Sequence, residues 1–359
     1  MNFAIHLNLC RFIFIRGYTS LPMTLEEFGF SEWFEKQVPT DGRWTVARIT
    51  AVHKGWADIS DGETTRPAKS TGTLRREARK KNNYLTVGDW ALCKNFDDGD
   101  FAMIHSVLKR KSELKRKTAG KEVGYQLIAA NIDTAFVVHT LDMGYNLRKL
   151  ERYLSIVHDS GIQPVVLMTK KDLLSRVELR DRMKEVQERL PNVPVYALSN
   201  TTGSGLRKAK KHLIPGKTYC LLGASGVGKT SFINSLLDKE DEYFTLPVRE
   251  KDGKGIHSTT WRELIVLTNG ALMIDTPGMR ELGHLDTAAG IDETFDDIVA
   301  LEGGCKFRDC AHVNTKGCAI ETAIEAGELS KERYENFIRM RAESAAAEEA
   351  LRQQGWKNR

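Results

Sequence analysis

The sequence lacks any run of the roughly 18 to 20 consecutive apolar residues that a membrane-spanning helix requires, so we expect no membrane contact. It also lacks a large excess of charge of one sign. With 53 Lys and Arg against 48 Asp and Glu, the net charge is only +5, and nucleic-acid binding has to be judged from local clusters. A hydrophobic content of 41% argues against wholesale disorder. The length of 359 residues predicts two or three domains, and we find no internal repeat.

Cysteine is scarce and unevenly placed. Of six cysteines, three lie between Cys305 and Cys318, beside a histidine, which favours metal ligation over a scattered disulfide framework. The others, Cys10, Cys93 and Cys220, are isolated, and we interpret them as core or incidental residues. This pattern suits a reducing compartment, and we expect a cytoplasmic protein.

Acidic residues are absent from the first 25 residues. The apolar stretch there has Arg11 and Arg16 at or beyond its middle, whereas a secretory signal carries its positive charge before the apolar run. An organellar targeting segment and an over-extended start both remain open. Met23 is the alternative start to Met1.

Short β-rich runs occupy the chain from Arg43 to about Val107, broken by glycine-containing turns, which is typical of a small all-β barrel or sandwich. Two basic runs accompany this region. Such runs are often only solvated faces, but a pair of them around one small domain favours contact with a phosphate backbone. Their members are Arg75, Arg76, Arg79, Lys80 and Lys81, and then Lys109, Arg110, Lys111, Lys115, Arg116 and Lys117.

From about Gln126 the pattern changes to short apolar strands that alternate with helical stretches such as 147–160. This alternation predicts a mostly parallel sheet covered by helices, with ligands at the carboxyl ends of the strands. The predicted strands are 134–140, 164–169, 193–199, 218–223, 264–267 and 271–275. From about Ile291 onward the chain should be largely helical around the cysteine cluster.

A phosphate-binding loop stands directly after one of these strands. The run Gly223-Ala-Ser-Gly-Val-Gly228-Lys229-Thr230 matches the P-loop pattern at every fixed position and precedes a helical run. Its backbone N–H groups can cradle phosphates, Lys229 can reach the β and γ oxygens, and Thr230 can ligate magnesium. The residues expected at the phosphates are Gly223, Ala224, Ser225, Gly226, Val227, Gly228, Lys229, Thr230 and Ser231.

Further motifs for magnesium and for the γ-phosphate follow downstream. Asp275 ends a predicted strand and suits the magnesium shell, while the N–H of Gly278 can sense the γ-phosphate. Between them and the P-loop, Thr259 or Thr260 is expected to close over the magnesium ion. Met279 stands where many GTPases have a water-orienting glutamine, so we consider His257 as the catalytic group, with a purely structural histidine as the alternative.

Guanine selection is predicted from the run Thr169-Lys170-Lys171-Asp172 after a strand. It resembles Asn-Lys-x-Asp, whose aspartate accepts both guanine N–H donors, with threonine in place of asparagine. The loss of that amide is expected to weaken the connection to the P-loop. Ser199 and Asn200 fit the loop that offers backbone N–H to guanine O6. Both base-reading motifs precede the P-loop, which reverses the usual order and indicates a circularly permuted domain.

The cluster Cys305-x4-Cys310-x-His312-x5-Cys318 offers three thiolates and one imidazole, the complete tetrahedral ligand set of a structural zinc site. Four protein ligands leave no position open for catalysis. Metal binding at such a site contributes on the order of 10 kcal/mol, so this part of the chain is expected to need zinc for folding.

Together these motifs resemble the ribosome small-subunit-dependent GTPase A (RsgA) family from about residue 40 onward. Segments that support the resemblance include 111–117, 129–133, 146–153 and 305–312. It implies a multidomain protein with an OB-fold β-barrel, a circularly permuted α/β P-loop GTPase domain and a C-terminal zinc-binding helical subdomain. The predicted boundaries are 1–39 for an N-terminal extension, 40–112, 113–285 and 286–359.

The resemblance also implies binding to the small ribosomal subunit and its rRNA, hydrolysis of GTP to GDP with magnesium, and a role in late maturation of that subunit. We expect a monomer. Two alternatives remain open. One is an RNA-binding assembly factor that holds GTP structurally with little hydrolysis, and the other is an ATP-using P-loop protein with a DNA-binding zinc finger.

Overall fold

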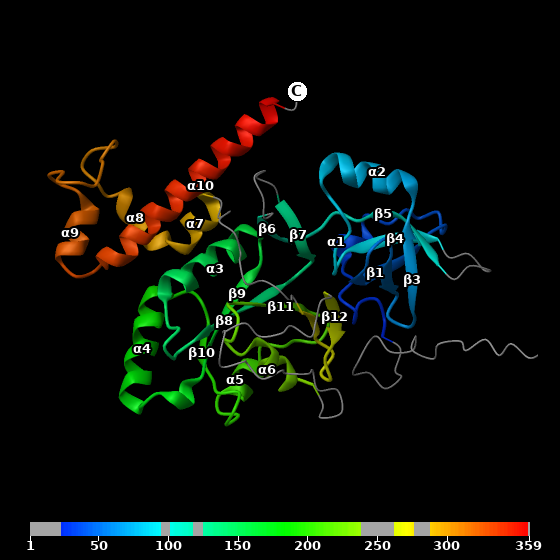
Figure 1. Cartoon of the computed structure of the whole chain (residues 1–359), viewed down its shortest axis with the longest axis horizontal. Helices are drawn as coiled ribbons and strands as arrows, with labels where there is room; N and C mark the ends of the chain where they lie inside the picture. The colour runs from blue at the N-terminus through cyan, green and yellow to red at the C-terminus, as the bar shows by residue number, and fades with distance from the viewer. Residues whose placement is uncertain (1–22, 95–100, 118–124, 238–261, 276–287, 358–359) are drawn as a thin grey trace, which may run out of the picture.

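A closed five-stranded barrel occupies the N-terminal part of this computed structural model, which describes residues 23–94, 101–117, 125–237, 262–275 and 288–357 (Figure 1). The strand order β1-β2-β3-β5-β4 closes on itself because β1 also pairs with β4. Apolar side chains such as Ala47 and Ile49 fill the interior. The strands are β1 (Thr45–Val52), β2 (Ala57–Ser60), β3 (Thr65–Ser70), β4 (Trp90–Lys94) and β5 (Ala102–Val107).

A helix, α2 (Gly72–Lys81), lies between β3 and β4, where the sequence patterns predict only β structure. The helix was missed because its charged residues leave only Leu74 and Ala78 as an apolar face. Its start is fixed by Thr71, whose side chain accepts a hydrogen bond from the Leu74 N–H, and Leu74 packs against the barrel core. Barrel and helix together confirm the expected OB-like fold.

The central domain is built on a mostly parallel sheet in the order β10-β9-β8-β11-β13-β12, with only β12 antiparallel to its neighbour. The expected strands are present to within two residues at each end. They are β8 (Thr134–Thr140), β9 (Gln163–Thr169), β10 (Val195–Ala197), β11 (Thr218–Leu222), β12 (Glu263–Val266) and β13 (Leu272–Asp275).

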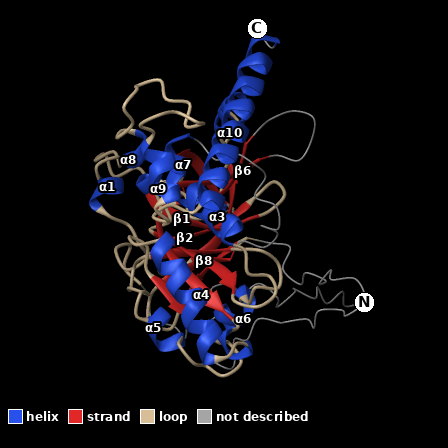
Figure 2. Cartoon of the chain, turned by 90° about the vertical axis from the view of Figure 1, so that its left-hand side faces the viewer, coloured by secondary structure: helices blue, strands red, loops and turns tan. Residues whose placement is uncertain are grey.

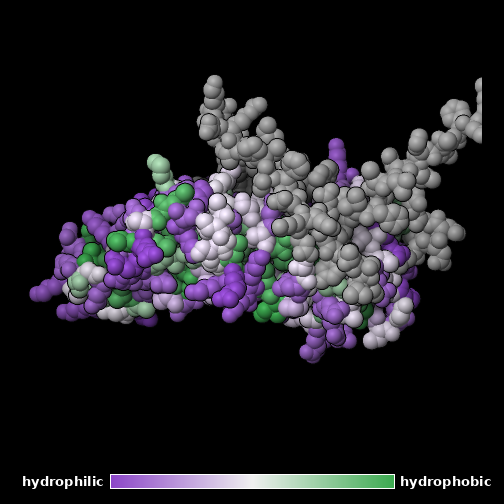
Figure 3. Space-filling view, turned by 90° about the horizontal axis from the view of Figure 1, so that it is seen from below, coloured by the Kyte–Doolittle hydropathy of each residue, from purple (hydrophilic) through white to green (hydrophobic). Residues whose placement is uncertain are grey.

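Helices cover both faces of this sheet (Figures 1 and 2). The helices α3 (Leu147–Asp159) and α4 (Arg176–Arg189) share one apolar cluster with Val137 and Val166. On the other face, α5 (Leu206–Lys210) and α6 (Lys229–Asn234) pack against Phe136 and Val138. Seen from below, hydrophilic residues predominate over the left-hand part of the molecule, with small hydrophobic areas between them (Figure 3).

The barrel and the sheet are joined by a buried arginine and by the N-terminal segment. Arg48 on β1 is 1% exposed and donates hydrogen bonds to the carbonyl of Phe28 (2.9 Å) and to the hydroxyl of Thr218 on β11 (2.8 Å). Burial lowers the pKa of Arg48 to about 10. Trp90 on β4 packs against Phe28 and Phe34, beside the short helix α1 (Glu32–Glu35). Residues 23–38 thus belong to the junction between the two domains, within the segment 1–39 predicted as an extension.

The C-terminal part is helical and rests on α3. It consists of α7 (Ala288–Thr294), α8 (Asp296–Glu302), α9 (Ala319–Glu325) and α10 (Lys331–Lys357). Gly290 on α7 approaches α3 so closely that a Cβ there would lie 2.3 Å from the Ser155 carbonyl oxygen. The far end of α10 projects from the molecule (Figures 1 and 2). None of the helices in the described ranges is long and apolar enough to cross a membrane.

A separate hairpin of β6 (Glu113–Lys117) and β7 (Tyr125–Ala130) connects the barrel to β8. The predicted boundary at residue 112 falls just before this hairpin, whereas the boundary at residue 285 lies outside the described residues. Both boundaries stay predictions.

Candidate active site and metal centre

The predicted P-loop follows β11 directly and wraps around the start of α6. Gly223 has φ +146°, and a Cβ there would lie 2.2 Å from the Val138 carbonyl oxygen, so only glycine fits this turn. Gly226 and Gly228 also have positive φ. The Lys229 ammonium donates to the carbonyls of Gly223 (2.8 Å) and Ala224 (2.6 Å), which holds its charge at the mouth of the loop. The loop therefore combines a fixed cation with backbone N–H donors, as phosphate binding requires.

The remaining described motifs gather at the same edge of the sheet. Since β8, β9, β10, β11 and β13 are parallel, the segments that follow them emerge at one side. Asp275 is the last residue of β13, which pairs with the P-loop strand β11. Its carboxylate and the exposed Thr230 are the described groups that suit a magnesium ion. His257, Thr259, Thr260 and Gly278 lie outside the described residues.

Thr169 connects the base-reading strand to the P-loop. Its side chain is fully buried, and its hydroxyl lies 2.6 Å from the Val227 carbonyl oxygen and 3.1 Å from that of His139. A hydroxyl has one proton, so it donates to one carbonyl at a time, with the shorter contact to the P-loop. The threonine hydroxyl thus makes a connection to the P-loop in place of the asparagine amide, and the expected weakening of that connection stays a prediction.

Lys170 and Asp172 follow at the end of β9. Lys170 has φ +60°, and its ammonium forms a 2.8 Å ion pair with Asp142, a residue that the sequence motifs did not indicate. Burial alone would raise the pKa of Asp142, but hydrogen bonds from Lys170, the Gly144 N–H and the Thr140 hydroxyl lower it to about 2. The Lys170 side chain is thus held in a fixed direction. Asp172, in the 3-10 turn η1 (Lys171–Leu173), is exposed and presents its carboxylate at the surface.

Asn200 provides a second connection between the base-reading loops and the P-loop. Its amide donates to the Gly228 carbonyl at 3.0 Å. A Cβ on Gly228 would lie 2.7 Å from that amide nitrogen, so the contact requires glycine. Ser199 is buried, and its hydroxyl accepts the Thr202 N–H at 3.1 Å, which shapes the loop. The sequence pointed to the backbone of this loop but not to the Asn200 side chain.

A buried histidine fixes the connection between β8 and α3. His139, next to the end of β8, accepts the backbone N–H of Asn146 through Nε2 at 3.0 Å and so fixes the start of α3. Burial lowers the pKa of His139 to about 4, with Lys149 nearby acting in the same direction. The ring is therefore neutral at physiological pH. Its side chain is a structural residue at the connection between β8 and α3.

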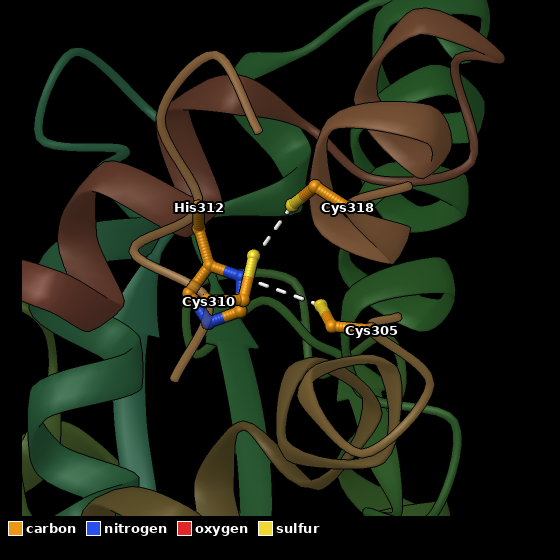
Figure 4. Close-up of side chains that lie close together, drawn as sticks. All are labelled: Cys305, Cys310, His312 and Cys318. Atoms are coloured by element: carbon orange, nitrogen blue, oxygen red, sulfur yellow. Dashed lines mark hydrogen bonds between the residues drawn. The ribbon is translucent and has the colours of Figure 1, made fainter. Parts of the chain in front are cut away.

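The cysteine cluster converges at one point beside α8, α9 and α10 (Figure 4). The ligand atoms of Cys305, Cys310, His312 and Cys318 lie within 4.8 Å of one another. His312 Nδ1 is 3.5 Å from the Cys305 sulfur and 3.4 Å from the Cys318 sulfur. A zinc ion with ordinary bond lengths would separate a sulfur and a nitrogen ligand by about 3.5 Å. The donor set and its spacing are thus compatible with one structural zinc ion.

Contacts around these ligands orient them. His312 has φ +56°, and its Nε2 faces the Glu302 carboxylate at 3.8 Å, which Arg341 in turn binds at 3.0 Å. The backbone N–H of His312 lowers the pKa of the Cys310 thiol. Cys318 caps α9, where the Glu321 N–H donates to its sulfur. A histidine ligand with a carboxylate behind it is typical of metal centres. The isolated cysteines Cys93 and Cys220 are buried, as the sequence predicted.

The two basic runs differ in the structure. On α2 the side chains of Arg75, Arg76, Arg79 and Lys80 are exposed. In the second run Arg110 is 6% exposed and pairs with Asp89 at 2.6 Å and with Glu113 at 3.1 Å, while Lys115 pairs with Glu113 at 2.6 Å. Arg110 is thus a structural residue, whereas Lys109, Lys111 and Lys115 of the same run are exposed, like the cations of α2.

The P-loop lies on a mostly parallel sheet. The base-reading motifs precede it in the chain but lie beside it in space. This arrangement, together with the OB-like barrel, defines a circularly permuted P-loop GTPase.

The family model described as RsgA GTPase matches residues 107–285. The chain is 38% identical to "Small ribosomal subunit biogenesis GTPase RsgA 2" of Listeria monocytogenes, over 90% of both chains. It is also 38% identical to "Small ribosomal subunit biogenesis GTPase RsgA" of Methanosarcina acetivorans, over 83% of this chain and 79% of that one.

Solved structures agree. YjeQ from Thermotoga maritima is 25% identical and superposes with a TM-score of 0.63 over 84% of this chain and 99% of that chain. YloQ, described as a circularly permuted GTPase, shares the fold at 24% identity with a TM-score of 0.61, over 86% of this chain and 98% of that chain. The chain belongs to the RsgA GTPase family. It is accordingly a GTP-hydrolysing enzyme.

Proposed function

We propose that this GTPase acts in biogenesis of the small ribosomal subunit, at a late step, as a timer that binds the subunit with GTP and leaves after hydrolysis to GDP. The observation that carries the proposal is the convergence of the P-loop, Asp275 and the Thr169 to Asp172 motif at one sheet edge. Bound GTP would order the loop around Thr259 and Thr260, and the ordered loop would lock the flanking domains onto the subunit. Hydrolysis would release them.

Residues in named roles complete the proposal. Asp172 selects guanine, Lys229 binds the β and γ phosphates, and Thr230 with Asp275 holds magnesium. His257 remains the proposed orienter of the catalytic water. The Cys305, Cys310, His312 and Cys318 cluster binds zinc and shapes the C-terminal subdomain. The exposed cations of α2 contact rRNA, and we propose that the protein works as a cytoplasmic monomer.

The test is multiple-turnover GTP hydrolysis by the zinc-loaded protein alone, with small subunits, and with large subunits as control. Without an activator we expect on the order of 10⁻⁴ to 10⁻² turnovers per second, and a rise of more than about tenfold with small subunits only. Lys229→Ala should abolish the stimulated rate. Normal turnover by that variant would refute the site assignment.

The alternative of a structural GTP-binding factor predicts tight GTP binding with no stimulation by either subunit. An ATP-using protein predicts that ATP displaces a bound fluorescent GDP as well as GTP does. Because the carboxylate of Asp172 matches two guanine donors, we expect ATP to fail in this competition.

A further inference from the structure

The outer face of β5 carries a strip of aromatic and basic side chains that the nucleotide site does not use. Along β5, Ala102 and Ile104 point into the barrel core, so Met103 and His105 face outward. Phe101 directly precedes the strand and is partly exposed. Met103 pairs with Lys69 on β3 and with Lys94 on β4, and both of these lysines are exposed. The outward side chains of three adjacent strands therefore meet in one row.

Cations lie over the aromatic rings of this face. The Lys69 ammonium is 4.0 Å from the centre of the Phe101 ring, and the Lys94 ammonium is 5.0 Å from that of Trp44. Trp44 also meets His105 edge to face at 5.0 Å. At both ends of the strip, a flat ring and a positive charge thus stand side by side.

The β1–β2 turn adds a second tryptophan in a fixed orientation. His53 stacks on Trp56 with ring centres 3.8 Å apart, and its Nε2 pairs with Asp58 at 2.9 Å. The turn closes through a hydrogen bond from the His53 N–H to the Trp56 carbonyl, with Gly55 at φ +93°. Trp56 in turn meets Phe101 edge to face at 6.5 Å. One face of the indole is covered by His53, which holds the ring still.

We call the residues Trp44, Trp56, Lys69, Lys94, Phe101, Met103 and His105 the stacking strip. These side chains lie outside the apolar cluster that fills the barrel, and of them only Trp44 packs against the neighbouring large cluster, so core packing does not account for Trp56, Phe101 or Met103. Of the described acidic groups near the strip, Asp58 is engaged with His53, and Asp41, near Lys94, is engaged with Arg43. A partner must therefore offer flat rings for the aromatic residues and negative charge for the lysines. Unpaired RNA offers both in regular alternation, whereas the bases of a duplex are stacked inside it.

We propose that the stacking strip binds single-stranded RNA, with unpaired bases on Phe101 and Trp56 and phosphates at Lys69 and Lys94. From Ala102 to His105 the strand extends about 10 Å, and Phe101 and Trp56 lie at its end, which leaves room for more than one splayed base. The inference rests on the proposed function, in that rRNA is the partner from which the strand comes. It adds the kind of RNA, the residues that read it and the face of the barrel involved.

The experiment measures binding of a fluorescent uridine-rich RNA of about 10 nucleotides to the full-length, zinc-loaded protein by anisotropy, with a duplex of equal length for comparison. We expect the single strand to bind more tightly than the duplex. Phe101→Ala and Trp56→Ala should each weaken single-strand binding about tenfold. Lys69→Gln should reduce the slope of log affinity against log salt by about 0.7.

The matched control is Trp33→Ala. Trp33 is 43% exposed and has the Lys109 ammonium 5.7 Å from its ring, but it lies on α1, outside the stacking strip. The Trp33→Ala variant should therefore bind RNA like the wild type. Phe101→Leu keeps apolar volume without a ring and guards against misfolding of the alanine variant. If Phe101→Leu binds the single strand as tightly as the wild type, or if Trp33→Ala weakens binding equally, the stacking strip is not the site.

The same proteins are assayed for stimulation of GTP hydrolysis by small subunits, which separates the two proposals. If small subunits stimulate GTP hydrolysis by the wild type, but Phe101→Leu binds RNA as the wild type does, the stacking-strip proposal is refuted and the proposed function stands. Absence of stimulation with the wild type would overturn the proposed function, whereas weaker single-strand binding by Phe101→Leu would still support the strip.

Discussion

At the scale of single residues, the hydroxyl of Thr169 is the contact most open to a test. We expect Thr169→Val, which keeps the shape but removes the hydroxyl, to leave the Val227 carbonyl unpaired and to loosen the P-loop. Affinity for a fluorescent GDP should fall several-fold, and the free energy of unfolding should fall by about 1–2 kcal/mol. Stopped-flow binding and urea denaturation measure the two effects. Thr169→Ser keeps the hydroxyl and is the control.

If Thr169→Val binds GDP like the wild type, the hydrogen bond to Val227 does not support the nucleotide site. Thr169→Asn restores the residue of the usual motif, and we expect it to bind GDP at least as well as the serine variant. These variants compare the amide and the hydroxyl at one position.

Candidate site residues can be recognised in the sequence where the chemistry is encoded in adjacent residues. The P-loop, Asp172 and the cysteine cluster are recognisable because their spacing alone defines the function. Sequence patterns missed Asp142 and the side-chain role of Asn200, since each acts on a residue that is 28 positions away in the chain. They also placed Arg110 in a basic surface, because only the fold reveals that Asp89 neutralises it.

At the scale of elements, a buried charge cluster fixes α10 to α3. Glu151 on α3 is 1% exposed and accepts hydrogen bonds from Arg333 and Asn336 on α10, both at 2.6 Å. We expect Glu151→Ala to destabilise the contact by about 3–5 kcal/mol, because it leaves Arg333 buried with less compensation. Arg148→Ala, which removes the more exposed pair with Glu332, should cost less than about 1 kcal/mol.

Urea denaturation followed by near-ultraviolet circular dichroism compares these two variants. Equal losses of stability would contradict the role given to the buried cluster. The strands of the sheet could be predicted from their apolar runs, but this packing of α10 on α3 could not. The reason is physical: α10 shows no one-sided apolar pattern, and Asp297 and Glu151 approach Arg333 only after α8 and α3 are in place.

At the scale of the whole molecule, the metal centre and the nucleotide site belong to separately stabilised parts. The three cysteines of the zinc site belong to an apolar cluster with α8, α9 and α10, whereas the P-loop belongs to the cluster on the opposite face of the sheet from α3. We therefore expect removal of zinc with a chelator, or Cys310→Ser, to unfold the C-terminal subdomain and leave GDP affinity within about twofold. Stimulation of GTP hydrolysis by small subunits should be lost, because the unfolded subdomain can no longer dock.

Elemental analysis, proteolysis of residues 288–357 and the GTPase assay check the three parts of this prediction. The untreated protein should contain one zinc ion per chain, and readdition of zinc to the chelated protein should restore both protease resistance and stimulation. Retained stimulation after verified loss of zinc would show that the metal centre is dispensable for docking. Loss of GDP binding in the same sample would instead show that the two parts fold together, with the buried contact between Glu151 and Arg333 as the connection.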